Sequence, residues 1–212
     1  MGAVTQLRRL RFFVVLALVL FSGCAHQLNL INAQKYYELG LQEEFRGNYS
    51  GAKEAFWRSF VNYRDAGASK AYISAAIYNL GRMTGYMCDF TKADELLKEA
   101  LVLERDVTGG ETTLNITKRL GELARLASAR HEYEESIGYY KEAVPGLENL
   151  GVLESQPIEF AIFIEDYAFV LEKAHYLQFA QEQTAKAKAI REEHKGDSAQ
   201  YEFVYYDQLC PQ

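Results

Sequence analysis

The sequence predicts an all-α protein in which four helical hairpins stack into a right-handed superhelix, an α-solenoid, behind an N-terminal signal peptide. Only 3 of the 212 residues are proline, and long segments without proline favour helices over a turn-rich β-sandwich. One pattern of small and large apolar residues also occurs four times, beginning at Ala33, Ser74, Thr117 and Ala161. Such internal recurrence is the signature of a repeat architecture.

Each repeat places small residues where two helices must approach closely and larger ones where a gap must be filled. In the first repeat Gly40 and Ala52 are small, Phe56 is large, and Gly47-Asn48 forms the turn between the two helices. Because one hairpin cannot bury its apolar stripe alone, we expect neighbouring hairpins to share a continuous core.

Turn-forming residues lie between the repeats, at 65–69, 109–110 and 149–157. The repeat domain is therefore predicted to cover residues 33–194. Residues 195–212, which include several aromatic side chains, are predicted to form a tail that caps the last hairpin, in a conformation left open. Pro145 is expected to end or kink the second helix of the third repeat.

The order Tyr36, Leu39 and Gly40 before Gly47-Asn48 resembles the tetratricopeptide repeat (TPR), a helix–turn–helix unit of about 34 residues. The starts of the four repeats are 41, 43 and 44 residues apart, which resembles the longer TPR variants such as those of kinesin light chain. The resemblance implies an array whose first helices line a concave groove that binds a protein or peptide.

The resemblance also implies which side chains meet a partner, because the same positions of each first helix face the ligand in TPR proteins. In this sequence the expected partner-binding residues are Tyr37, Leu41, Tyr78, Arg82, Lys118, Arg125, Glu165 and Phe169. Tyrosine and arginine are frequent in binding hot spots. The alternative is that several of these side chains pack inside the superhelix or against the C-terminal tail.

The N-terminus has the parts of a secretory signal. Arg8, Arg9 and Arg11 precede ten apolar residues, 12–21, and small residues follow. A spanning helix needs about 20 apolar residues, so we expect residues 1–23 to be a signal peptide, with a signal anchor as the alternative.

The residues around Cys24 resemble a bacterial lipobox, Leu20-Phe21-Ser22-Gly23-Cys24. The resemblance implies lipidation of Cys24, attachment to the membrane through that lipid, and a short tether over residues 24–32. The next residue is Ala25 rather than aspartate, which by similarity to enterobacterial sorting implies the outer membrane, facing the periplasm.

Several kinds of chemistry find no support in the sequence. The net charge is −6 and no basic run exists, which argues against nucleic acid as a partner. His131-Glu132 begins like a zinc-protease motif but lacks the second histidine. We therefore expect no enzyme activity, no catalytic residue, no cofactor and no metal site. Cys88 and Cys210 lack metal-like or catalytic neighbours, so the sequence favours two separate thiols, although the periplasm permits a disulfide.

Together these observations predict a membrane-anchored scaffold or assembly factor of the bacterial envelope. It would bind an unidentified envelope protein or extended peptide in its concave groove. Two alternatives stay open: a small-ligand or glycan-binding envelope protein, and a structural lipoprotein that associates with itself. An open trough would favour the scaffold, and a deep pocket with converging carboxylates would favour the small ligand.

Overall fold

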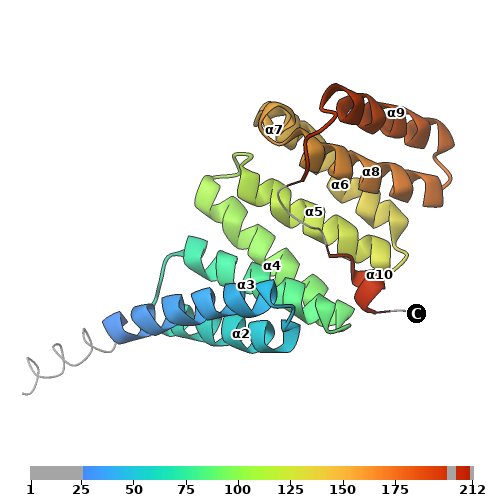
Figure 1. Ribbon diagram of the computed structural model, residues 1–212. Coiled ribbons are helices and arrows are strands. Elements are labelled where there is room, and N and C mark those ends of the chain that lie inside the picture. Colours follow the sequence, from blue (N-terminus) through green and yellow to red (C-terminus); the bar gives the residue numbers. More distant parts are fainter. Residues whose placement is uncertain (1–25, 200–203, 211–212) are drawn as a thin grey trace, which may run out of the picture.

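The computed structural model describes residues 26–199 and 204–210 (Figure 1). The predicted signal peptide (residues 1–23) and the predicted lipidation site, Cys24, lie outside these residues. Within the described part of the chain, no helix is both long enough and apolar enough to cross a membrane.

Four helical hairpins follow one another along the described chain, which confirms the predicted all-α solenoid (Figure 1). The first helices of the hairpins are residues 26–45, α3 (Lys70–Tyr86), α5 (Leu114–Ala129) and α8 (Pro157–Lys173). The second helices are α2 (Tyr49–Asp65), α4 (Phe90–Thr108), α6 (Tyr133–Asn149) and α9 (Leu177–Glu193). The two short helices are α7 (Val152–Ser155) and α10 (Tyr206–Leu209).

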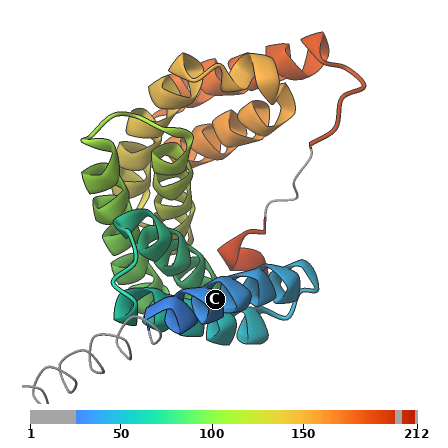
Figure 2. The same cartoon turned by 90° about the vertical axis from the view of Figure 1, so that its left-hand side faces the viewer.

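The hairpins stack into an arc, and α10 lies on its inner side (Figure 2). One cluster of buried apolar residues runs through the stack, from Ala52 in α2 to Ile190 in α9. Close approach within a hairpin depends on the small residues: a Cβ at Gly40 would lie 2.6 Å from the ring of Phe56. The predicted continuous core is therefore confirmed.

The turn inside each hairpin uses the same backbone conformation. Gly47, Cys88, His131 and His175 occupy the same place in the four repeats, with φ angles of 74°, 64°, 61° and 65°. Glycine adopts this left-handed conformation freely, whereas a Cβ makes it costly. Three of the four hairpins therefore keep the turn geometry of the repeat without its glycine.

Two local features differ from what the sequence suggested. Residues 26–32, expected to be part of a tether, are helical and continuous with the first helix of the first repeat. No glycine or proline interrupts them, and Leu30 packs beside the buried Ala33. Of the two effects expected of Pro145, the first does not occur, because α6 does not end there and continues to Asn149. Pro145 and Lys141 are both exposed, so water can replace the backbone hydrogen bond that proline removes.

A buried ion pair fixes the third repeat against the second. The guanidinium of Arg119 in α5 lies 2.9 Å from the carboxylate of Glu104 in α4, and both side chains are almost fully buried. The hydroxyl of Ser74 in α3 lies within hydrogen-bond distance of both groups. Because a buried charge must keep its partner, this pair holds α3, α4 and α5 in a fixed relation around the middle of the groove.

Candidate functional site

The chain's own C-terminal segment (residues 204–210) occupies the middle of the arc. Its helix α10 contacts α3 and α5, the first helices of the second and third repeats (Figure 2). The prediction that the tail caps the last hairpin is therefore wrong for these residues. The outer helix of that hairpin, α9, buries only Ala180, Ala187 and Ile190, and its Leu177 and Phe179 are left more than half exposed.

A disulfide ties the C-terminal segment to the second repeat. Cys88, in the turn after α3, is bonded to Cys210, and their Cα atoms are 5.6 Å apart. The expectation of two separate thiols is therefore wrong. The return of the segment to α3 brings together two residues that are 122 positions apart. Cys88 is exposed, whereas Cys210 is buried.

Tyr206 anchors the C-terminal segment between the two repeats. Its ring is buried, with its centroid 5.3 Å from that of Tyr86 and 6.0 Å from that of Phe90. Gly85 in α3 provides the space, because a Cβ at this position would lie 2.3 Å from a carbon of the Tyr206 ring. We call the surroundings formed by Gly85, Tyr86, Phe90 and Glu122 the tyrosine subsite.

Glu122 forms the polar end of the tyrosine subsite. The hydroxyl of Tyr206 donates to one carboxylate oxygen, and Arg125 donates to the other over 2.8 Å. The Nε atom of Arg82 lies 3.7 Å from the same carboxylate. Burial alone would raise the pKa of Glu122, but the charges of Arg125 and Arg82 outweigh it and lower the pKa. The carboxylate is therefore ionised and ready to accept a hydroxyl hydrogen bond.

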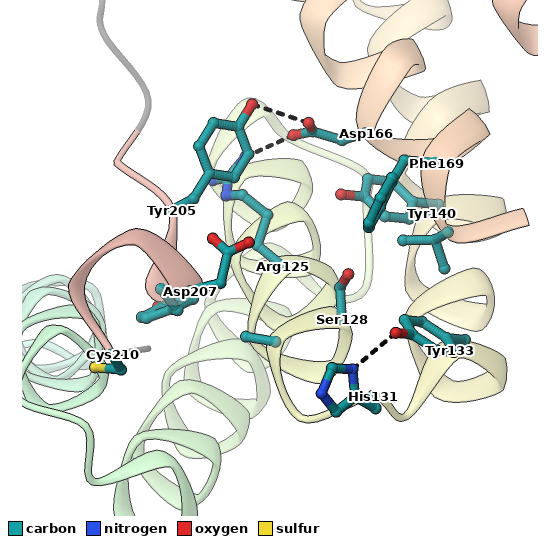
Figure 3. A pocket seen from close by; sticks show the side chains of 13 residues that line it. Arg125, Ser128, His131, Tyr133, Tyr140, Asp166, Phe169, Tyr205, Asp207 and Cys210 are labelled. Carbon is teal, nitrogen blue, oxygen red and sulfur yellow. Dashed lines mark hydrogen bonds and ion pairs between the residues drawn. The ribbon is translucent and has the colours of Figure 1, made fainter. Parts of the chain in front are cut away.

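A second tyrosine of the segment reaches the fourth repeat (Figure 3). The hydroxyl of Tyr205 donates to Asp166 in α8 over 2.9 Å, and Arg125 approaches the other oxygen of Asp166 to 4.0 Å. Burial is the main cause that raises the pKa of Asp166 to about 6, against the opposing effect of Arg125. The C-terminal segment thus contacts first helices of three consecutive repeats.

An open pocket of about 220 Å³ lies beside the segment, between the third and fourth repeats (Figure 3). Its wall includes Arg125, His131, Tyr140, Asp166 and Phe169 from the repeats. Tyr205 and Asp207 form the side that belongs to the C-terminal segment. The inner face of the arc is therefore a trough that is partly filled by the chain itself.

The structure brings four of the eight predicted partner-binding residues into contacts near the middle of the groove. Arg82 and Arg125 both face Glu122. The side chain of Tyr78 lies between Arg82 and Arg119, 5.7 and 5.1 Å from its ring centroid. The hydroxyl of Tyr37 accepts a hydrogen bond from Asn79 over 2.9 Å.

The other four predicted residues lie nearer the surface. Glu165 forms a two-point pair with Arg191, at 2.6 and 2.7 Å. Lys118 is exposed, and Leu41 and Phe169 are 44% and 49% exposed. Some of the eight residues are therefore packed within the array and others are exposed, and their contact with a partner stays a prediction.

Sequence reasoning missed the residues on which the tyrosine subsite depends. Glu122, Gly85 and Tyr206 are not among the predicted residues, and their contact joins positions far apart in the chain. One signal was present: Arg82 and Arg125 occupy the same position in adjacent repeats, and two facing cations require an acidic partner. Among the described residues, no group of three or more histidine, cysteine or acidic side chains could hold a metal ion.

No protein-family model matches the sequence, and the curated proteins give no match. Solved structures, in contrast, align with this chain. BtubC (BKLC) from P. vanneervenii aligns with a TM-score of 0.72 at 17% identity, over 81% of this chain and 68% of that chain. The chain has a TPR-type fold.

Two further solved structures align less well. The TPR-like repeats of a kinesin light chain from Podosopora anserina give a TM-score of 0.47 at 14% identity, over 77% of this chain and 97% of that chain. The MamA protein gives a TM-score of 0.45 at 15% identity, over 81% of this chain and 98% of that chain.

Proposed function

We propose that this protein is a lipid-anchored scaffold of the bacterial envelope that binds an extended segment of another protein in its groove, without catalysing a reaction. The observation that carries the proposal is the position of the C-terminal segment. A short stretch of chain lies on the first helices of the repeats and is held there by two tyrosines. A groove that binds a segment of its own chain in this way has the shape and chemistry to bind a segment of a partner protein.

The proposed location rests on two independent features. The basic and apolar N-terminus ends in a lipobox-like sequence at Cys24, and the disulfide between Cys88 and Cys210 suits an oxidising compartment such as the periplasm. Ala25 after the cysteine favours the outer membrane. A lipid at Cys24 would place the first repeat close to the membrane, because residues 26–45 form one continuous helix.

The two ends of the groove are where we expect a partner to make its first contacts. Leu41 and Phe45 are 44% and 94% exposed in the first repeat, and Phe169 is 49% exposed in the fourth. Exposed aromatic and aliphatic side chains that flank an occupied centre provide anchors without requiring the centre to open.

Photo-crosslinking in cells tests the scaffold proposal. A photoreactive residue at Phe45 or Phe169 should yield adducts with the same envelope protein. The matched control is Val102, which is 63% exposed on the second helix of a repeat and should not yield that adduct. Recovery of only lipid or self adducts from both groove positions would overturn the proposal. Metabolic labelling with a radioactive fatty acid tests the anchor, and Cys24→Ser should abolish the label.

A further inference from the structure

We infer that the middle of the groove is a binding site for a partner segment with two adjacent tyrosines, which the chain's own tail occupies until the Cys88–Cys210 disulfide is reduced. The inference rests on the proposed function, since it names the partner chemistry and the regulation of the same groove.

The tyrosine subsite selects for a hydroxyl as well as for a ring. Gly85 leaves space for the ring, and Tyr86 and Phe90 contact it. Glu122, at the end, accepts the hydroxyl hydrogen bond. A phenylalanine would fill the same space but leave that acceptor without its donor, which is unfavourable for a buried polar group. The ligand that fits is therefore a tyrosine.

The subsite can also exist without its occupant. If Tyr206 leaves, Glu122 still has Arg125 at 2.8 Å, and Arg82, which also pairs with Glu44 at 2.7 Å, lies 3.7 Å away. A buried carboxylate is strongly destabilising only when no cation compensates it. Because both cations come from the repeats, the Glu122 carboxylate stays paired when the tail leaves, and the emptied subsite is accessible to a partner.

A second subsite follows at the distance of one residue. Tyr205 has an extended backbone, with φ of −96° and ψ of 140°, and donates to Asp166 in the next repeat. Asp207 and Gln208, which follow the tyrosines, are exposed. The groove thus recognises a short segment with two adjacent tyrosines, and Val204 before them and Leu209 after them add apolar contacts with the core.

The disulfide controls access to both subsites. Cys88 is exposed, so the thiolate of an external dithiol can attack its sulfur and break the bond to Cys210. Cys210 leaves as a thiolate and takes up a proton. The second thiol of the dithiol then attacks the mixed disulfide, forms the oxidised dithiol and releases Cys88. Two electrons and two protons pass from the dithiol to the protein.

Opening the disulfide changes the competition for the groove. While it is closed, the tail is fixed next to its site and excludes a partner. After reduction the tail keeps its side-chain contacts with Glu122 and Asp166 but loses its covalent link to α3. It then competes with a partner as a segment tethered to α9, at an effective concentration of the order of millimolar. A partner segment that also contacts the exposed ends of the groove can then displace the tail.

Fluorescence anisotropy tests the inference with a synthetic peptide. The fluorescein-labelled peptide repeats the sequence of residues 204–209 and therefore contains no cysteine. It is titrated with the purified full chain in its oxidised form and after treatment with dithiothreitol. We expect binding to tighten about 10-fold or more on reduction, and no binding of a peptide with both tyrosines replaced by alanine. Equal binding by the oxidised and reduced chains would overturn the inference.

Matched glycine substitutions locate the peptide. Gly85→Ala would place a Cβ in the tyrosine subsite, whereas Gly138→Ala, on the exposed side of α6, meets no atom within 4 Å. In the reduced chain we expect Gly85→Ala to abolish peptide binding and Gly138→Ala to leave it unchanged, with circular dichroism showing that both remain helical. Equal binding by the two variants would place the peptide elsewhere and overturn the inference.

Two other outcomes also decide the matter. If reduction converts the chain to a dimer that Tyr206→Ala prevents, the occupant is the tail of a second copy, and the partner assignment is wrong. If no form of the chain binds the peptide while crosslinks at Phe45 and Phe169 still capture one envelope protein, the inference about the tyrosine subsite fails and the scaffold function stands.

Discussion

The ends and the middle of the groove differ in how exposed the side chain at one repeat position is. This position holds Leu41 in the first repeat and Phe169 in the fourth, and both are about half exposed. In the second and third repeats it holds Arg82 and Arg125, whose side chains are only 20% and 11% exposed and face Glu122. Repeat position therefore determines which residues face the groove, but the contacts around each of them determine how exposed it is.

The largest expected effect separates the covered middle from the open end. Tyr206→Ala should lower the free energy of unfolding by about 3–5 kcal/mol, because it removes a buried aromatic ring. The matched change at the open end, Phe45→Ala, removes a ring that is 94% exposed and should alter stability by no more than about 0.5 kcal/mol. Urea denaturation of the oxidised proteins, followed by circular dichroism, measures both. Similar losses in the two variants would contradict the comparison.

Removal of the disulfide should have the next largest effect. The bond joins residues 122 positions apart and restricts the unfolded chain, so its loss should lower the free energy of unfolding by about 2–4 kcal/mol. The double variant Cys88→Ser/Cys210→Ser is compared with the oxidised wild type in urea. Dithiothreitol should destabilise the wild type and leave the double variant unchanged. Identical midpoints for the oxidised wild type and the double variant would show that the bond does not restrain the fold.

Asp166 should make the middle of the groove sensitive to pH. Its pKa is raised from 3.8 to about 6, so the folded state holds the proton more tightly. Its contribution to stability is complete below about pH 4 and is lost as the pH rises through 6. The surrounding charged and titratable groups are Arg125, Tyr205, Glu165 and Asp207.

The variant Asp166→Asn isolates this effect, because asparagine does not titrate. Measured by urea denaturation, the stability of the wild type relative to the variant should fall between pH 4 and pH 6 and then level off. Thermal scans at the same pH values serve as a second measure. A difference that stays constant over the whole range would mean that Asp166 has an ordinary pKa.

The smallest expected effect concerns the turns of the hairpins. His175 has a φ of 65° in an exposed turn at the end of the array, so His175→Gly should raise the free energy of unfolding by up to about 1 kcal/mol. His131→Gly should raise the free energy of unfolding by less, because this variant loses the 2.7 Å contact between His131 and the hydroxyl of Tyr133. Thermal denaturation measures both, and His175→Ala, which keeps a Cβ, is the control that should show no gain.

Local patterns in the sequence were sufficient to predict the hairpins. The recurrence of residues such as Gly40, Ala52 and Phe56 reports contacts within one repeat, and those contacts are set by a fixed spacing along the chain. The helical start at residues 26–32 was missed because its stability depends on packing of Leu30 and Ala33. That packing is visible only when the second hairpin is in place.

The tyrosine subsite was not predictable for a different reason. Its residues come from α3, α4, α5 and the C-terminal segment, and no periodicity relates Tyr206 to Glu122, 84 positions earlier. The same holds for the bond between Cys88 and Cys210, because sequence spacing gives no distance in space. The aromatic composition of the tail indicated that it must pack somewhere, but the place depends on the space that Gly85 leaves in a helix far away in sequence.

The bond between Cys88 and Cys210 also decides how the molecule would respond to mechanical tension. A force applied between residues 26 and 210 passes through the first hairpin and α3, and then crosses the sulfur bridge directly. The helices from α4 to α9 lie inside the covalent ring and carry no load. Only residues 26–88 can unravel, to a reach of about 200 Å at roughly 3.4 Å per residue. If Cys24 carries the proposed lipid, that stretch would act as an extensible linker between the membrane and a domain that stays folded.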